Sequence, residues 1–196
     1  MTQSALNARP DRGRLVWLGR LIGAGALLAV AGWQQPQSAR AADNGKVACE
    51  VKENGKAASG TLSLLQGDKE VASGPCGKPI SVAAGDYDAV LSLDGALDGP
   101  QQKKPVKVAA GQTVSANADF ATGLLEVRIR SQGRDTAGMA IIRKDGKQVG
   151  TLGSGVAAHL STGSYQVVAK YRTQQKVFDA VAIQQGKPTV LEASFE

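Results

Sequence analysis

The composition of this chain describes a mildly basic protein whose charge is unevenly distributed. It has 196 residues, with 23 Lys and Arg against 17 Asp and Glu, for a formal charge of +6. Residues 1–41 hold five of the Arg and one Asp, which leaves 18 basic and 16 acidic side chains, or +2, in the rest. So small an excess argues against a nucleic-acid partner.

The first 41 residues have the pattern of a secretory signal peptide. Three Arg up to Arg14 precede an apolar run of thirteen residues, 21–33, and a small-x-small cleavage pattern follows at 39–41. Cleavage there would make Ala42 the first residue of the mature chain. The alternative is an uncleaved anchor, but thirteen residues are too few to cross a bilayer and Arg20 interrupts a longer run. Export predicts a periplasmic or secreted protein of a bacterial envelope.

Beyond the leader the sequence repeats itself. Residues 82–87 (VAAGDY) recur as 160–165 (LSTGSY), and the same offset of 78 aligns the strand-like residues near Cys49 with those near Val127. Later in the repeat the offset falls to 75, because one loop is shorter in the second copy. We therefore expect two tandem domains, 42–120 and 121–196, joined by a short connection that predicts a semi-rigid pair.

The residues of both copies alternate between apolar and polar, which is typical of half-buried strands. Leu125, Val127 and Ile129, for example, alternate with charged residues, and Asp145-Gly146 is typical of a tight hairpin turn. We expect seven strands in the first copy, with counterparts in the second, near residues 46–51, 60–66, 69–73, 79–83, 86–94, 104–109 and 112–120. This pattern predicts an all-β fold of two seven-stranded Ig-like or transthyretin-like antiparallel β-sandwiches.

The only two cysteines, Cys49 and Cys76, both lie in the first copy. Export to an oxidising compartment favours a disulfide between them. A zinc site would need more ligands, and a redox pair would usually be a Cys-x-x-Cys motif. We therefore expect a structural disulfide that stabilises the first copy by about 3 kcal/mol.

The order of motifs in each copy resembles the PEGA-like and carboxypeptidase-regulatory-like domains, which are small transthyretin-like sandwiches of bacterial proteins. The resemblance rests on an apolar-x-x-Gly-x-Tyr motif, an alternating strand, a Val-x-Val segment, a Gly-bearing turn and a final strand that ends in Phe. It implies turn and packing roles for Gly85, Tyr87, Gly163 and Tyr165. It also implies a non-catalytic module that serves in structure, adhesion or docking.

The sequence contains only weak candidates for catalytic or metal-binding residues. His159 alternates with apolar residues on an expected strand, so we interpret it as a solvated side chain. Four carboxylates, Asp86, Asp88, Asp94 and Asp98, surround one strand and could supply oxygen ligands to calcium, but their spacing favours a solvated rim. Lys46 or Lys52 with Asn117 would be the ingredients of an isopeptide bond, which we consider a minor alternative. We expect no catalytic, metal or cofactor site, and hence no enzyme.

The second copy carries the clearest hint of a binding surface. It has ten basic against six acidic side chains, whereas the first copy has eight against ten. A candidate docking face consists of Arg128, Arg130, Lys170 and Arg172, which alternation would direct outward, with Arg143 as a further member. The alternative, which the modest charge favours, is a solvated face that only keeps the protein dispersed. The expected partner of the docking face is another envelope protein or an anionic envelope polymer, with membrane contact only through an uncleaved leader. The alternative function is a carbohydrate-binding or calcium-assisted adhesion module, although both Trp residues lie in the leader.

Overall fold

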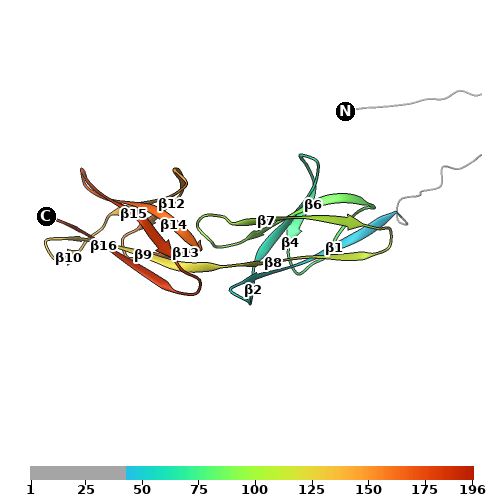
Figure 1. Ribbon diagram of the computed structural model, residues 1–196, viewed down its shortest axis with the longest axis horizontal. Helices are drawn as coiled ribbons and strands as arrows, with labels where there is room; N and C mark the ends of the chain where they lie inside the picture. Colours follow the sequence, from blue (N-terminus) through green and yellow to red (C-terminus); the bar gives the residue numbers. More distant parts are fainter. Residues whose placement is uncertain (1–42) are drawn as a thin grey trace, which may run out of the picture. The chain divides into compact units, whose positions relative to one another are not determined.

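The computed structural model describes residues 43–196, and this part of the chain is all-β, as predicted. The predicted leader and its cleavage site lie outside the described residues. Sixteen strands form two groups, β1–β8 and β9–β16, which meet where β8 runs into β9 with one residue, Ala121, between them (Figure 1). Within the described range, no helix is long and apolar enough to span a membrane.

The first group forms two four-stranded sheets. In one sheet β1 pairs with three strands: with β5 near its start, with β2 near its end, and with β8 along residues 46–53. The second sheet has the order β4-β3-β6-β7. The strands are β1 (Asn44–Glu53), β2 (Lys56–Ala58), β3 (Gly60–Gln66), β4 (Lys69–Pro75), β5 (Ile80–Ala83), β6 (Gly85–Leu93), β7 (Gln101–Val108) and β8 (Thr113–Phe120).

The second group repeats this topology strand for strand. Its sheets have the orders β10-β9-β13, with β16 paired to β9, and β12-β11-β14-β15. The strands are β9 (Thr122–Ser131), β10 (Arg134–Asp135), β11 (Met139–Lys144), β12 (Lys147–Gly153), β13 (Ala157–Ser161), β14 (Gly163–Tyr171), β15 (Gln174–Ile183) and β16 (Pro188–Phe195).

Two details differ from the sequence expectation. Each copy has an eighth, short strand, β2 or β10, which folds back on the first strand of that copy through Asn54-Gly55 or Gln132-Gly133. All four of these turn residues have positive φ. The sandwiches are also not wholly antiparallel, because the first and last strands of each copy pair in parallel, β1 with β8 and β9 with β16.

Each sandwich encloses its own aliphatic core. In the first copy Val47, Leu62 and Leu91 are fully buried, and in the second Leu125, Ile142 and Val167 are. The alternation read from the sequence produces these cores, since inward residues on β1 and β9 are buried while their neighbours face solvent. The hairpin at Asp145-Gly146 also forms, with φ values of 50° and 75° that suit a two-residue turn.

Candidate functional site

The two tyrosines of the repeated motif occupy equivalent positions. The Tyr87 hydroxyl donates a hydrogen bond of 2.9 Å to the carbonyl of Ala83, and the Tyr165 hydroxyl lies 2.9 Å from the carbonyl of Ser161. Both rings are at least nine-tenths buried. A buried tyrosine that bonds back to the backbone four residues upstream ties a strand to the turn before it. Such rings offer no exposed platform for stacking a sugar.

The predicted disulfide is present between Cys49 and Cys76, whose Cα atoms lie 5.0 Å apart. The second copy has Val127 and Ser154 in these places, and the surrounding backbone hydrogen bonds are the same: Gly77 N–H donates to Cys49 as Gly155 N–H donates to Val127. The Ser154 hydroxyl accepts a 2.9 Å hydrogen bond from the Ile129 N–H. A side-chain hydrogen bond therefore stands in the second copy where the first has a covalent link.

Polar residues from both copies meet where β8 runs into β9. The side chain of Asn54 bonds Thr122 in both directions: its Nδ2 donates to the Thr122 carbonyl at 3.1 Å, and its Oδ1 accepts from the Thr122 N–H at 3.0 Å. The Thr122 hydroxyl donates to the carboxylate of Glu53. Thr122 is fully buried, and all of the described residues belong to one compact unit. Side-chain hydrogen bonds thus join the two sandwiches in addition to the covalent connection through the chain.

His159 lies beside this group and is not free. Its Nδ1 is 2.7 Å from Oε1 of Glu53, a residue of the other copy, while half of its side chain stays exposed. Burial acts to raise the pKa of Glu53, but hydrogen bonds from Thr122 and His159 outweigh it and hold that pKa below its ordinary value. The pair links β1 to β13, and His159 also lines a shallow pocket of about 380 Å³ beside Asn54 and Thr122.

A second contact joins the copies through the loop between β6 and β7. Leu97 packs against the core of the second sandwich, over Gly150 of β12, where a Cβ would lie only 2.4 Å from the Leu97 Cγ. The Leu97 N–H donates to the carbonyl of His159 at 2.8 Å, and Ala96 forms a parallel bridge with His159. Glycine at position 150 leaves the space that this leucine fills.

Asp98, next in the same loop, has a side chain that is only 4% exposed. Its two oxygens accept hydrogen bonds from different donors, Oδ1 from the Ser161 N–H at 3.1 Å and Oδ2 from the Tyr165 hydroxyl at 2.8 Å, with Lys144 Nζ at 3.7 Å. Burial acts to raise the pKa of Asp98, and these donors outweigh it and lower the pKa. Burial and then the Asp98 carboxylate raise the pKa of Tyr165 well above its usual range.

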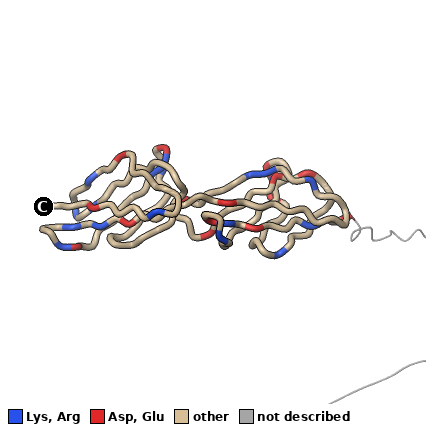
Figure 2. Tube along the Cα trace, turned by 60° about the horizontal axis from the view of Figure 1, so that its bottom comes forward, with Lys and Arg blue, Asp and Glu red and all other residues tan. Residues whose placement is uncertain are grey.

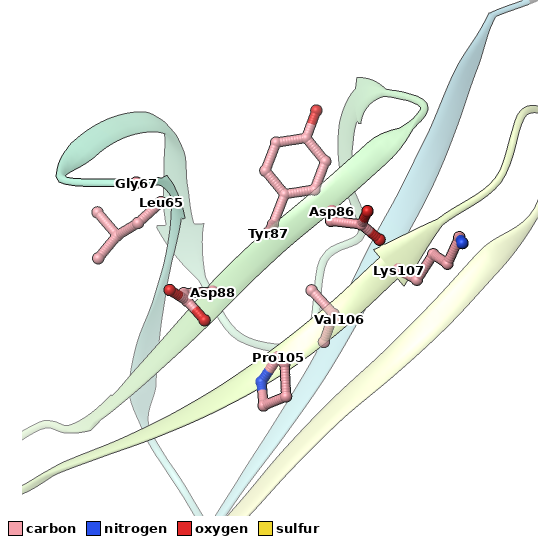
Figure 3. A pocket seen from close by; sticks show the side chains of 8 residues that line it. All are labelled: Leu65, Gly67, Asp86, Tyr87, Asp88, Pro105, Val106 and Lys107. Atoms are coloured by element: carbon pink, nitrogen blue, oxygen red, sulfur yellow. The ribbon is translucent and has the colours of Figure 1, made fainter.

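The other carboxylates of the predicted acidic rim point elsewhere. Asp88 forms an ion pair of 2.9 Å with Lys103, and Asp94 accepts a long hydrogen bond from Thr61. Asp86 and Asp88 line an open pocket of about 380 Å³. Figure 3 shows both along β6, with Lys107 on the neighbouring strand. Among residues 43–196 no group of three or more His, Cys, Asp or Glu side chains is arranged to hold a metal ion.

The five cations of the predicted docking face do not share one sheet. Arg128 and Arg130 lie on β9, whereas Arg143 and Lys170 lie on β11 and β14 of the opposite sheet, with Arg172 just after β14. Arg128 is paired with Glu126 at 2.6 Å, and Arg130 with Asp135 at 3.2 Å. Figure 2 shows acidic and basic positions interspersed over both sandwiches. The prediction of a single basic face is therefore wrong.

The residues weighed for an isopeptide bond are engaged in other contacts. Oδ1 of Asn117 accepts a hydrogen bond from the Glu50 N–H at 3.1 Å. Lys52 forms an exposed ion pair of 3.4 Å with Glu50. Lys46 pairs with Thr113 through the parallel ladder of β1 and β8, four residues before Asn117. These side chains lie on the surface of the sheet and are not brought together in an enclosed site where an isopeptide bond could form.

The junction was not predicted from the sequence. Asp98 was expected in an acidic rim, and no contact was expected for Asn54, Glu53, Leu97 or Thr122. One signal was available: the loop after β6 is longer in the first copy, and it carries an apolar Leu97 among turn residues, where solvated loops are usually polar. Unequal loops in a repeat are a reason to look for a contact between the copies.

Comparison with known proteins finds only distant similarity, to solved structures. No protein-family model and no curated protein matches the sequence. Among solved structures, the chain is similar to the minor pilin of Streptococcus agalactiae (10% identity, 77% of this chain and 94% of that one, TM-score 0.39). It is also similar to a candidate adhesin of Bacteroides ovatus (8% identity, 76% and 87%, TM-score 0.40). It spans 34% of the Bacillus anthracis TIE protein, at 13% identity and a TM-score of 0.36 over 78% of this chain. The PEGA-like resemblance stays a prediction.

Proposed function

We propose that this chain is an exported, non-catalytic protein of the bacterial envelope, in which two sandwiches act as one structural unit that docks to other envelope components. The observation that carries the proposal is the junction. The groups that an enzyme could use, His159, Glu53, Asp98 and Tyr165, are bonded to one another across the two copies. Their contacts with one another hold the copies together.

The junction has the properties of a stiff connection. It combines the two-way Asn54–Thr122 bond with the buried carboxylate of Asp98 and the packing of Leu97 over Gly150. These contacts lie on separate loops and strands, so a hinge motion would have to break several of them together. Each neutral hydrogen bond contributes about 0.5–1.5 kcal/mol, and bonds to a charged group contribute more. A fixed spacing between two surfaces is what a structural or docking module needs.

The disulfide supports the location. Structural disulfides persist in oxidising compartments and are rare in the cytosol. The Cys49–Cys76 link closes across the first sandwich, where it adds stability to a small core. The predicted leader at residues 1–41 points to the same compartment.

Calorimetry of the exported chain tests the structural part of the proposal. We expect one cooperative unfolding transition, because the junction couples the two cores. Replacing Thr122 by Val and Leu97 by Ala removes the hydroxyl bonds and the packing, and should separate the transition into two. Thr113→Val, at an exposed strand position, is the matched control and should leave one transition. Two independent transitions in the unmodified chain would contradict the proposal.

Location and binding need a separate experiment. Cell fractionation should find the chain in the envelope or the medium with Cys49 and Cys76 oxidised, as judged by resistance to thiol labelling. Affinity capture from envelope fractions, identified by mass spectrometry, should return a protein or anionic polymer. A glycan array examines the carbohydrate-binding alternative, and reproducible binding there would replace the docking function.

A further inference from the structure

The outer face of the β12-β11-β14-β15 sheet carries an apolar row. Val168 lies on β14 between the inward-facing Val167 and Ala169, and it is only 5% exposed although it lies outside the cluster of side chains that forms the second core. Its direct neighbours across the strands are Ile141 on β11 and Val177 on β15. Met139, beside Ile141 on the same face, is 46% exposed, and Val177 is 47% exposed. We call these four residues the outer row.

The first copy shows that the fold does not require this row. The same register there places Ser63 beside Val90 and Val90 beside Lys103, so Ser63 and Lys103 stand where the second copy has Ile141 and Val177. Thr61 stands in the place of Met139. Two sandwiches of one topology thus differ along these central strands: the first exposes an apolar Val71 on its edge strand β4, and the second has a continuous apolar row across β11, β14 and β15. An exposed apolar patch on a surface is typical of a contact with another molecule.

A row of opposite charges runs beside the outer row. Arg143 on β11 donates to Oε1 of Gln166 on β14 at 3.4 Å, and Nε2 of Gln166 donates to Oδ1 of Asp179 on β15 at 2.8 Å. The positive and negative ends of this row therefore lie on the two strands that flank β14. The glutamine at the centre bonds to both.

We propose that the outer face binds the same face of a second copy of this chain, around a two-fold axis that runs along β14. Such an axis exchanges β11 and β15 and leaves β14 facing itself. It places Arg143 of one copy over Asp179 of the other, twice, and it places Ile141 over Val177 and Val168 over Val168. An isologous contact needs a surface that complements itself in this way. The same axis brings Lys170, beside Met139 at the end of the row, over its own equivalent, and this like-charge contact weakens the dimer.

The contact is small, so the dimer should be weak. Stable interfaces bury about 800 Å² per partner, and one face of a four-stranded sheet is at or below that size. We expect a dissociation constant of roughly 10 µM to 1 mM. Concentration at the envelope or attachment to a common partner would favour the dimer through effective concentration. The inference is independent of the junction and stands even if the proposed function fails.

Sedimentation of the exported chain over a range of concentrations tests the proposal. We expect a reversible dimer in the unmodified chain and a monomer in the double variant Ile141→Ser with Val177→Lys. These substitutions introduce the residues that the first copy already carries at the same positions, so the fold should accept them. Val90→Ser, on the corresponding face of the first copy, is the matched control and should leave the dimer intact.

A charge exchange distinguishes this arrangement from other contacts. Arg143→Asp alone and Asp179→Arg alone should each weaken the dimer about tenfold or more, because like charges then face each other across the axis. The two changes together should restore it. A chain that stays monomeric at the highest concentrations, or a dimer that is unaffected by the outer-row variant or not restored by the exchange, would overturn the proposal.

Discussion

The carboxylate of Asp98, in the first sandwich, accepts a 2.8 Å hydrogen bond from the hydroxyl of Tyr165, in the second. That hydroxyl also lies 2.9 Å from the Ser161 carbonyl, so its one proton is shared between two acceptors. Tyr87 has the same place in the first copy and bonds only to its own backbone. The repeated tyrosine thus hydrogen-bonds to a turn in both copies, and in the second copy it also hydrogen-bonds to the neighbouring sandwich.

Replacing Asp98 by Asn should destabilise the junction. The carboxylate uses one oxygen for the Ser161 N–H and the other for the Tyr165 hydroxyl, and an amide has only one oxygen. The Tyr165 hydroxyl then keeps only the Ser161 carbonyl as acceptor and loses its bond to a charged group, a kind of bond that contributes about 1.5–3 kcal/mol. Urea unfolding measures the loss. Asp86→Asn, at an exposed position of the same strand region, should change the unfolding free energy by less than about 0.5 kcal/mol.

Acid should weaken the junction before it affects the cores. The pKa values of Glu53 and Asp98 are both lowered from ordinary values of 4.5 and 3.8. The unfolded chain therefore binds protons first, so these groups stabilise the fold fully above about pH 4.5 and lose that contribution as the pH falls further. The unfolding free energy measured between pH 6 and pH 3 should decline, and Glu53→Gln with Asp98→Asn should flatten the decline. An unchanged slope in this variant would contradict the assignment.

The disulfide can be replaced by the pair of residues that the second copy has at the equivalent positions. Cys49→Val with Cys76→Ser introduces the counterparts Val127 and Ser154, and the new hydroxyl can accept a hydrogen bond as Ser154 does. We expect a net loss of about 2–3 kcal/mol, because a loop closure of this length contributes about 3 kcal/mol and the hydrogen bond returns part of it. Denaturant unfolding gives the value. Cys49→Ala with Cys76→Ala should lose more, since it provides no acceptor and less volume.

The two tyrosines should respond unequally to loss of the hydroxyl. Tyr87→Phe removes one hydrogen bond to the Ala83 carbonyl and should cost about 1 kcal/mol. Tyr165→Phe also removes the donor to the buried Asp98 carboxylate, so we expect about 2–3 kcal/mol. Parallel unfolding of the two variants gives the difference. Equal losses would show that the bond to Asp98 adds nothing.

The all-β fold was predictable because the alternation of apolar and polar residues within each strand shows which side chains face the core. On β9, Leu125, Val127 and Ile129 alternate with polar residues, and the structure buries all three completely. Asp145-Gly146 specified its turn for an equally local reason, since both residues accept positive φ. Information of this kind lies within a few neighbouring residues.

The predicted docking face failed because alternation does not say which strands are neighbours. It directed Arg128 and Lys170 outward, and both do face away from a core, but their strands belong to opposite sheets. The parallel pairing of β1 with β8 was missed for the same reason. Contacts such as Glu53 with His159 join residues more than a hundred positions apart, and no periodicity within one copy reports them.

The contact of Leu97 with Gly150 gives the tandem a direction. The loop that carries Leu97 and Asp98 belongs to the first sandwich, whereas in the second sandwich a two-residue turn, Arg172-Thr173, connects the corresponding strands. The first copy therefore supplies the loop that makes the contact, and the second copy supplies the surface against which that loop packs. Exchanging their order in the gene would preserve every strand and both cores while abolishing the bond between them.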